Sequence, residues 1–169
     1  VVHRDLKPAN VLVGNLGGLR QAKVGDFGLV RILCDTASPR LTLTGTPLGT
    51  PGYMAPEQVL RASEADERSD IFSLGCILYR MLCGRAPFGG DVPAAYDDLA
   101  RGRYTPPEEH APGLDSRFIR TIAACLVVAP ESRPPDIQGL RALLSRGPRP
   151  DAAPSGSLAL SEKGHAPPK

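Results

Sequence analysis

The amino-acid sequence predicts an α+β fold: a mainly helical domain built around one buried helix, with a short β-hairpin near the N-terminus. Three observations support this class. Two short strand-like runs flank a glycine-rich stretch within the first 24 residues, a nearly continuous apolar run covers 71–83, and amphipathic patterns recur after residue 90. A chain of 169 residues, 41% of them apolar, fits one such domain with one core.

The hairpin is predicted from two apolar runs, at 11–13 and at 22–24. Gly14, Asn15, Gly17 and Gly18 lie between them. Glycine reaches the positive φ angles that tight hairpin turns need, so this stretch should reverse the chain.

The buried helix is predicted between Ser69-Asp70, a typical helix start, and Gly84, a typical stop. Apolar residues between these limits cover nearly every helical face, so we expect burial on all sides. The run is too short to cross a bilayer, and Asp70 and Arg80 lie inside it.

Further helices are predicted at 92–101, 115–128 and 136–145; Asp115-Ser116 opens the second and Pro130 closes it. From residue 146 to 169 the sequence is rich in Pro, Gly, Ala and Ser and has no aromatic residue. Such a segment buries too little apolar surface to offset its chain entropy. We therefore expect a folded domain over 1–145 and a disordered tail over 146–169.

Charge and cysteine content restrict the class of partner and the compartment. The chain has 20 basic and 18 acidic residues, a balance that does not predict nucleic-acid binding. Its four cysteines are too widely spaced for a metal knuckle, and no apolar run is long enough to span a membrane. We expect a cytoplasmic protein. Because the chain begins at Val1 without methionine, we also expect a fragment, and a membrane anchor elsewhere in the parent protein stays open.

Two motifs carry the chemistry. His3 to Asn10 reads HRDLKPAN, in which a carboxylate, an ammonium and an amide are two and three residues apart, and DFG follows at 26–28. Phosphoryl transfer from a magnesium nucleotide needs these groups: a carboxylate for the hydroxyl proton, a positive charge for the phosphate and oxygen ligands for the cation.

Three more motifs follow in order: GTPGYMAPE at 49–57, SDIFSLG at 69–75 and ESRPP at 131–135. With these five motifs, residues 1–145 resemble the eukaryotic-like, bacterial-type protein serine/threonine kinases. The resemblance implies a protein-kinase-like fold, of which this chain holds only the mainly helical C-terminal lobe. It also implies ATP and Mg²⁺ as cofactors and Ser/Thr-containing proteins as substrates in signalling. A kinase dimer that phosphorylates itself in trans is a compatible partner.

The resemblance assigns roles to the polar residues. Asp5 would accept or orient the proton of the substrate hydroxyl, Lys7 would neutralise the transferred phosphate, and Thr50 would bridge these two residues. The metal ligands would be Asn10 and Asp26. The nucleotide-binding set would be Lys7, Asn10, Leu12 and Asp26.

Other matches are structural. His3 would pack against Phe27 rather than act as a base. Glu57 and Arg133 would form a buried ion pair. Asp70 would accept hydrogen bonds from the backbone of the catalytic loop and so position Asp5.

The activation segment, residues 26–57, contains Thr42, Thr44 and Thr46. We expect one or more of these threonines to be phosphorylated and favour Thr44 and Thr46. Arg4 and Arg31 match positions that grip such a phosphate in relatives, and a dianion between two guanidinium groups would order the segment. The alternative is that these threonines only form a polar loop.

Three positions depart from common family patterns. Relatives that prefer arginine upstream of the target often carry Glu where this chain has Ala9 and Arg80, which weakens the case for a basic recognition sequence. Phe72 stands where many relatives have tryptophan.

Two functions stay open at this stage. The chain contains no glycine-rich phosphate loop of the form GxGxxGxV, because it starts after the region that would hold it, and we expect weak ATP binding by the chain alone. It is thus either part of an active kinase or a noncatalytic module that binds substrates or partner kinases. A small-molecule phosphotransferase is disfavoured by GTPGYMAPE, which resembles a peptide-binding platform.

Overall fold

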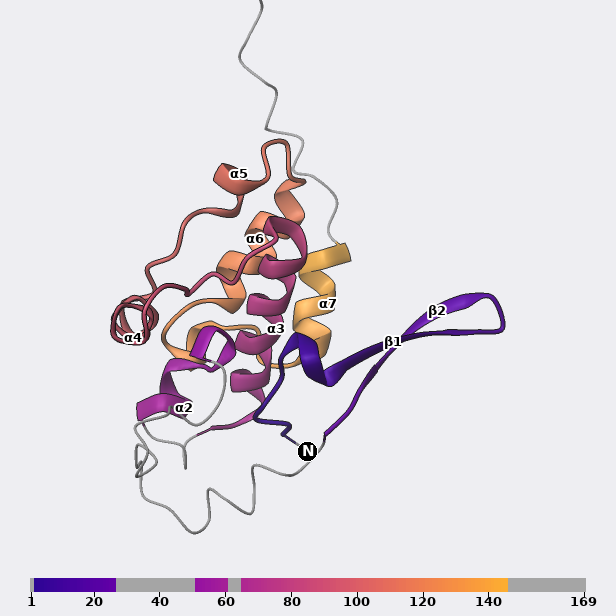
Figure 1. Ribbon diagram of the computed structural model, residues 1–169, viewed down its shortest axis with the longest axis horizontal. Helices are drawn as coiled ribbons and strands as arrows, with labels where there is room; N and C mark the ends of the chain where they lie inside the picture. The colour runs from indigo at the N-terminus through magenta and orange to yellow at the C-terminus, as the bar shows by residue number, and fades with distance from the viewer. Residues whose placement is uncertain (1, 27–50, 61–64, 146–169) are drawn as a thin grey trace, which may run out of the picture.

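The computed structural model describes residues 2–26, 51–60 and 65–145, and the predicted tail at 146–169 lies outside these ranges. The described residues form helices and one two-stranded antiparallel sheet, in agreement with the α+β prediction (Figure 1). No helix in this part of the chain combines the length and apolar character that a membrane span requires.

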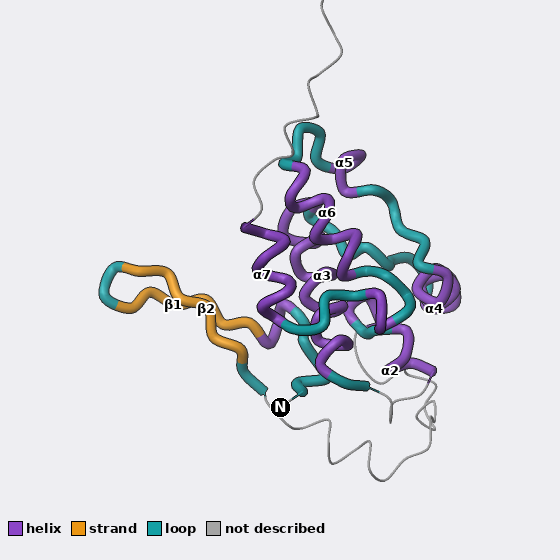
Figure 2. Tube along the Cα trace, turned by 180° about the vertical axis from the view of Figure 1, so that it is seen from behind, coloured by secondary structure: helices purple, strands orange, loops and turns teal. Residues whose placement is uncertain are grey.

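The predicted hairpin consists of β1 (Val11–Leu16) and β2 (Leu19–Val24), paired so that Val11 faces Val24. Only Gly17 (φ 59°) and Gly18 (φ 84°) form the turn, and their positive φ angles suit a two-residue hairpin loop. The pairing of β1 with β2 therefore includes residues 14–16, which the sequence pattern placed in the turn. The hairpin projects from the helical body (Figures 1 and 2).

Helix α3 (Glu67–Cys83) begins two residues before the predicted start, so the assignment of Ser69-Asp70 as its cap is wrong. The side chain of Asp66 accepts a hydrogen bond from the backbone N–H of Arg68 at 2.8 Å and caps the helix instead. The predicted stop is correct: Gly84 ends the helix with φ 74°.

Most of α3 is buried. Phe72, Cys76 and Tyr79 are almost fully buried, and the Phe72 ring stacks on Phe88 with centroids 5.8 Å apart. The expectation of burial on all sides fails near the C-terminal end, where Arg80 is exposed and Met81 keeps 76% of its surface accessible.

The remaining α-helices are α2 (Pro56–Leu60), α4 (Val92–Arg101), α5 (Pro107–His110), α6 (Ser116–Cys125) and α7 (Ile137–Ser145). Short 3-10 turns lie at Pro8–Asn10, Pro51–Tyr53 and Pro130–Ser132. The bounds of α4 match the prediction, and α7 starts one residue late. The pattern did not predict α2 or α5.

The predicted end of the 115–128 helix is wrong, because α6 stops at Cys125. The carbonyl oxygens of Val127 and Val128 instead accept hydrogen bonds from the Arg133 side chain, at 2.7 and 2.8 Å. Arg133 lies only five and six residues farther along the chain, so these are local contacts of the segment that follows α6.

Three helices form the packed body: α3 lies against α6, and α6 lies against α7 (Figure 2). Gly75 of α3 permits the closest approach, since a β-carbon there would lie 2.5 Å from the Cβ of Cys125. The buried residues Ile71, Cys125 and Leu140 form a small cluster where the three helices meet.

Candidate active site

The loop before β1 is fastened to α3 through Asp70. One carboxylate oxygen accepts the backbone N–H of His3 at 2.7 Å, and the other accepts the N–H of Arg4 at 2.9 Å. Hydrogen bonds to an ionised acceptor are stronger than neutral ones. They hold Arg4 at φ 66°, a left-handed backbone conformation that a non-glycine residue adopts at an energetic cost.

Gln58 on α2 also holds the loop before β1 in place. Its amide nitrogen donates to the carbonyl of Arg4 at 2.7 Å, and its amide oxygen accepts the N–H of Ala55 at 2.9 Å. Gln58 is buried, so each end of the amide is satisfied within the protein. The sequence does not predict this role, because a glutamine beside a motif has no pattern that distinguishes a bridging role from a surface one.

The loop brings Asp5, Lys7 and Asn10 together. Lys7 Nζ donates to Asp5 Oδ2 at 2.8 Å, and Asn10 Nδ2 donates to the same oxygen at 3.2 Å and to the Asp5 carbonyl at 2.8 Å. Within the described residues, Asp5 Oδ1 takes part in no hydrogen bond. The carboxylate is partly exposed, so one oxygen is held while the other is open to a proton donor.

Asn10 and Asp26 are the oxygen donors that could hold a cation. Asn10 is buried, and because its Nδ2 donates to Asp5, its Oδ1 is left as an acceptor. The N–H of Gly25 donates to the Asn10 carbonyl at 2.8 Å, which brings the residue before Asp26 beside Asn10. An amide oxygen and a carboxylate are hard ligands, and Mg²⁺ in nucleotide sites takes few ligands from the protein, so the pair fits it.

His3 is buried beneath this loop. Its Nε2 lies 2.8 Å from the Gly25 carbonyl, and its Nδ1 accepts the N–H of Asp5 at 3.3 Å. Both contacts suit the tautomer that carries hydrogen on Nε2. His3 thus links the Asp5 segment to the segment before Asp26.

Arg133 and Glu57 form a bidentate ion pair with N–O distances of 2.7 and 2.8 Å. Ser69 also donates to Glu57, at 2.7 Å. Burial alone would raise the pKa of Glu57, but the hydrogen bonds from Arg133 and Ser69 hold it below its usual value.

The other donors of Arg133 are also used. They reach the carbonyls of Arg68, Val127 and Val128 at 2.7 to 3.0 Å, and the guanidinium lies 4.8 Å from the centre of the Phe72 ring. The side chain therefore joins the starts of α2 and α3 to the segment after α6. Its charge is fully compensated although the side chain is buried.

Several predicted site residues lie outside the described residues: Phe27, Arg31, Thr42, Thr44, Thr46 and Thr50. Of the others, Arg4 donates to the Ala65 carbonyl at 3.3 Å. Leu12 lies on the projecting hairpin with 64% of its surface exposed.

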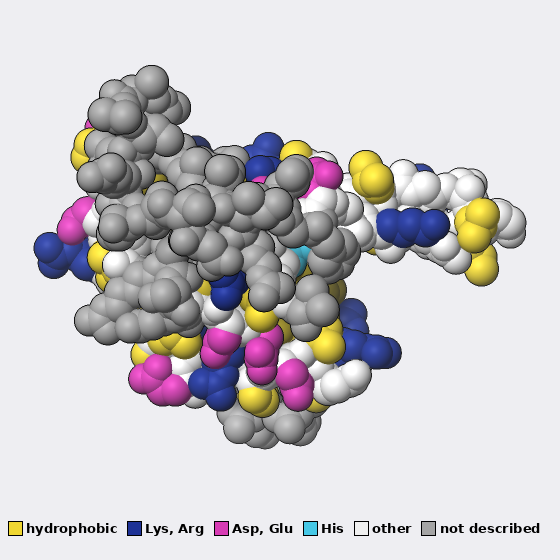
Figure 3. Space-filling view, turned by 90° about the horizontal axis from the view of Figure 1, so that it is seen from below, with side chains coloured by type: hydrophobic (Ala, Val, Ile, Leu, Met, Phe, Trp, Pro, Cys, Tyr) yellow, Lys and Arg dark blue, Asp and Glu magenta, His cyan; other side chains and the backbone are white. Residues whose placement is uncertain are grey.

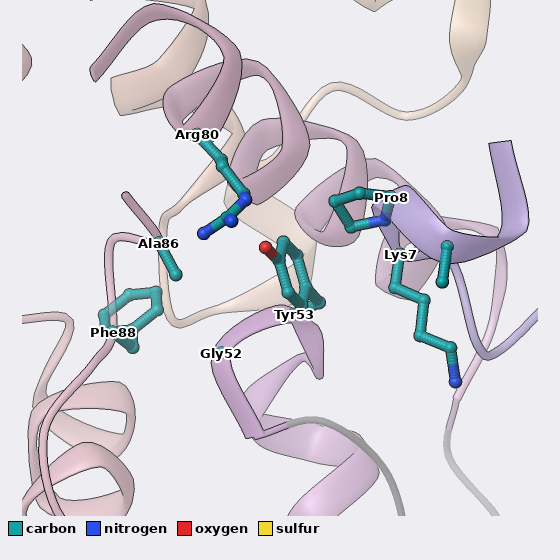
Figure 4. Close-up of a pocket in the computed structure, with 8 residues that line it drawn as sticks. Lys7, Pro8, Gly52, Tyr53, Arg80, Ala86 and Phe88 are labelled. Carbon is teal, nitrogen blue, oxygen red and sulfur yellow. The ribbon is translucent and has the colours of Figure 1, made fainter. Parts of the chain in front are cut away.

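A pocket of about 410 Å³ opens beside the Asp5–Lys7 pair (Figure 4). It takes one wall from the loop, one from the turn before α2 and one from the end of α3 and the segment that follows. The lining residues are Lys7, Pro8, Ala9, Gly52, Tyr53, Arg80, Ala86 and Phe88. Ala9 and Arg80 are two of the positions at which the sequence departs from common family patterns, and Tyr53 belongs to the GTPGYMAPE motif.

The mixed fold of helices and a small two-stranded sheet is compatible with a protein kinase domain, and comparison with known proteins agrees with that class. Residues 1–142 match the family described as "Protein kinase domain". The chain belongs to this family.

Within the family, the chain is similar to bacterial serine/threonine kinases. It is 39% identical over 138 residues to "Probable serine/threonine-protein kinase CE0033" of Corynebacterium efficiens, which covers 80% of this chain and 20% of that protein. It is 38% identical over 160 residues to "Serine/threonine-protein kinase PknB" of Mycolicibacterium smegmatis, which covers 90% of this chain and 24% of that protein. It is 37% identical over 148 residues to "Serine/threonine-protein kinase PknB" of Mycobacterium tuberculosis, which covers 86% of this chain and 23% of that protein. The chain thus spans about a fifth to a quarter of the length of these relatives.

Proposed function

We propose that residues 1–145 form the C-terminal lobe of a protein serine/threonine kinase and that the protein transfers the γ-phosphate of ATP to Ser or Thr hydroxyls of other proteins. The observation that carries this proposal is the cluster at Asp5, in which Lys7 and Asn10 hold one carboxylate oxygen and leave the other open. The names of the bacterial relatives support the choice of Ser/Thr over other acceptors.

In the proposed reaction, Asp5 Oδ1 orients the substrate hydroxyl and takes its proton as the oxygen bonds to the γ-phosphorus. The bond from that phosphorus to the β–γ bridging oxygen breaks, and ADP leaves. Lys7 places a positive charge where negative charge gathers on the transferred phosphate. Asn10 and Asp26 would hold Mg²⁺, which offsets phosphate charge when bound.

ATP binding in this proposal needs more than the present chain. The chain contains no GxGxxGxV loop to cover the phosphates, and its exposed hairpin residue Leu12 would offer only one face to a nucleotide. We therefore assign the activity to the complete protein.

Regulation by phosphorylation belongs to the same proposal. Thr42, Thr44 and Thr46 would accept phosphate, and Arg4 and Arg31 would bind it. Phosphopeptide mapping after incubation with ATP tests this: an unmodified segment in a fully active enzyme removes the switch.

The test of the function uses the full-length product of the gene with γ-labelled ATP, Mg²⁺ and a mixture of Ser- and Thr-containing peptides. Asp5→Asn should lower phosphate transfer by about 10²- to 10⁴-fold, because it removes the proton acceptor. Asp91→Asn is the matched control, since Asp91 caps α4 and asparagine caps a helix equally well.

Equal transfer by wild type and Asp5→Asn would refute the assigned role of Asp5. A wild-type protein that binds peptides or other kinases without transferring phosphate would favour the noncatalytic binding module.

A further inference from the structure

The pocket beside the catalytic loop contains a cation whose charge no described carboxylate neutralises. Arg80 extends from α3 into this pocket, and its guanidinium points toward the hydroxyl end of Tyr53 (Figure 4). Among the residues the structure describes, Arg80 forms no ion pair and no side-chain hydrogen bond, and the lining includes no Asp or Glu. Arg101, Arg103 and Arg133, by contrast, are each paired with a carboxylate.

The walls around Arg80 favour an anion. Pro8, Ala86 and Phe88 contribute apolar lining, and the charged residues of the described lining, Lys7 and Arg80, are both cationic. Burial raises the pKa of Tyr53 above its usual value, although the charge of Arg80 acts in the opposite direction. The Tyr53 hydroxyl therefore stays protonated at neutral pH and can donate a hydrogen bond.

The position of the pocket relates it to the substrate. Lys7 lines the pocket and also contacts Asp5, the group that would receive the target hydroxyl. A peptide with its hydroxyl at Asp5 would thus have a neighbouring side chain at the pocket. Ala9, on the loop wall, offers no charge to attract a basic side chain.

We propose that this pocket is a subsite for an acidic side chain of the protein substrate and that Arg80 determines this specificity by binding its carboxylate. The identity of the ligand as a substrate rests on the proposed function. Arg80 touches neither the reacting hydroxyl nor the phosphate, so it acts on the choice of peptide.

The test uses the full-length gene product and a set of peptides with one Ser or Thr, in which each flanking position in turn is Glu, Gln or Lys. At one position Glu should exceed Gln by about five- to tenfold in kcat/KM, mainly through KM, as expected for a charge-assisted hydrogen bond in a partly exposed site. In Arg80→Glu the same position should favour Lys. Arg141→Glu, which changes an exposed arginine on α7 by the same charge, should keep the preference for Glu.

Binding of the same peptides, measured by fluorescence anisotropy, separates this inference from the proposed function. A wild-type protein that transfers no phosphate but binds the Glu peptides better, with the preference lost in Arg80→Glu, supports the subsite and refutes the kinase assignment. An active enzyme without an acidic preference at any position, or with one that survives Arg80→Glu, overturns the subsite. Arg80→Gln, which keeps a polar side chain at this exposed site, should abolish the preference without reversing it.

Discussion

Asp70 shows how a single side chain positions the candidate catalytic loop. It lies in the first turn of α3 and accepts two N–H groups from residues 66 and 67 positions away in the sequence. Both bonds end on the segment just before Asp5. The strained backbone of Arg4 persists because these bonds, together with Gln58, hold it from both sides.

Replacing Asp70 by alanine should lower the free energy of unfolding by about 2 to 4 kcal/mol, because two backbone donors lose a charged acceptor. Asp70→Asn retains one acceptor oxygen and should cost about half as much. Urea denaturation of the three proteins measures both values. Equal stability of wild type and Asp70→Ala would show that water replaces the carboxylate without cost.

The Glu57–Arg133 pair is the second decisive contact at this scale. Arg133→Leu should destabilise the protein by about 3 to 5 kcal/mol, because Glu57 would stay in a buried position with only Ser69 as a side-chain donor. A double-mutant cycle with Glu57→Gln measures the coupling by urea denaturation. The double variant should be more stable than the sum of the single changes predicts.

If the two changes have additive effects on the free energy of unfolding, the Glu57–Arg133 ion pair is not the source of the lost stability. Additive effects would point instead to the carbonyls of Arg68, Val127 and Val128, which Arg133 also satisfies.

At the scale of elements, helix limits depend on which polar side chains are free to cap. The sequence offers two starts for α3, at Asp66 and at Ser69-Asp70. Ser69 donates to Glu57 and Asp70 accepts the N–H groups of His3 and Arg4, so neither serves the helix end, and Asp66 caps it. A local pattern cannot distinguish these uses, because the competing partners lie far away in the chain.

The contact between α3 and α6 depends on the absence of a side chain at Gly75. Gly75→Ala should lower the free energy of unfolding by about 1 to 3 kcal/mol, since the new β-carbon would meet Cys125 at 2.5 Å. The steric cost should exceed the gain in helix propensity of about 1 kcal/mol. Thermal and urea unfolding measure the change.

Gly14→Ala is the matched control. Nothing lies within 4 Å of the position of its β-carbon in β1, so this variant should be as stable as wild type. If Gly75→Ala is as stable as wild type, α3 and α6 can move apart without a cost in the free energy of unfolding.

At the scale of the whole molecule, the hairpin stands apart from the packed helices, and apolar side chains lie along it and at its tip (Figure 3). Leu16 and Leu19 face each other across the two strands and are 64% and 70% exposed. Exposed apolar surface of this kind promotes association.

Leu16→Lys combined with Leu19→Glu should reduce self-association of the 169-residue chain, because an opposite-charge pair replaces an apolar one. The free energy of unfolding should change by less than about 0.5 kcal/mol, since neither leucine contacts the core. Sedimentation velocity and urea denaturation test the two effects. Met81→Lys removes an isolated exposed residue as a control, and an equal effect of that change would exclude the hairpin as the cause.

The sequence by itself predicted the hairpin and the helices α3, α4, α6 and α7, and it supplied the polar residues of the loop before β1. The glycine pair of the hairpin, the apolar run of α3 and the order of the motifs are local properties, and each predicts its structure from neighbouring residues. Resemblance to the kinases also predicted that Glu57 meets Arg133 and that Asp70 meets the loop.

Only the tertiary structure decided which polar groups compete for the same partners. It gave Gln58 its bridging role and joined Lys7, Tyr53 and Arg80 around one pocket. Each outcome depends on burial and on contacts between distant segments. A short stretch of sequence predicts neither the burial nor these contacts, because the free energy of a polar side chain depends on its surroundings in the folded protein.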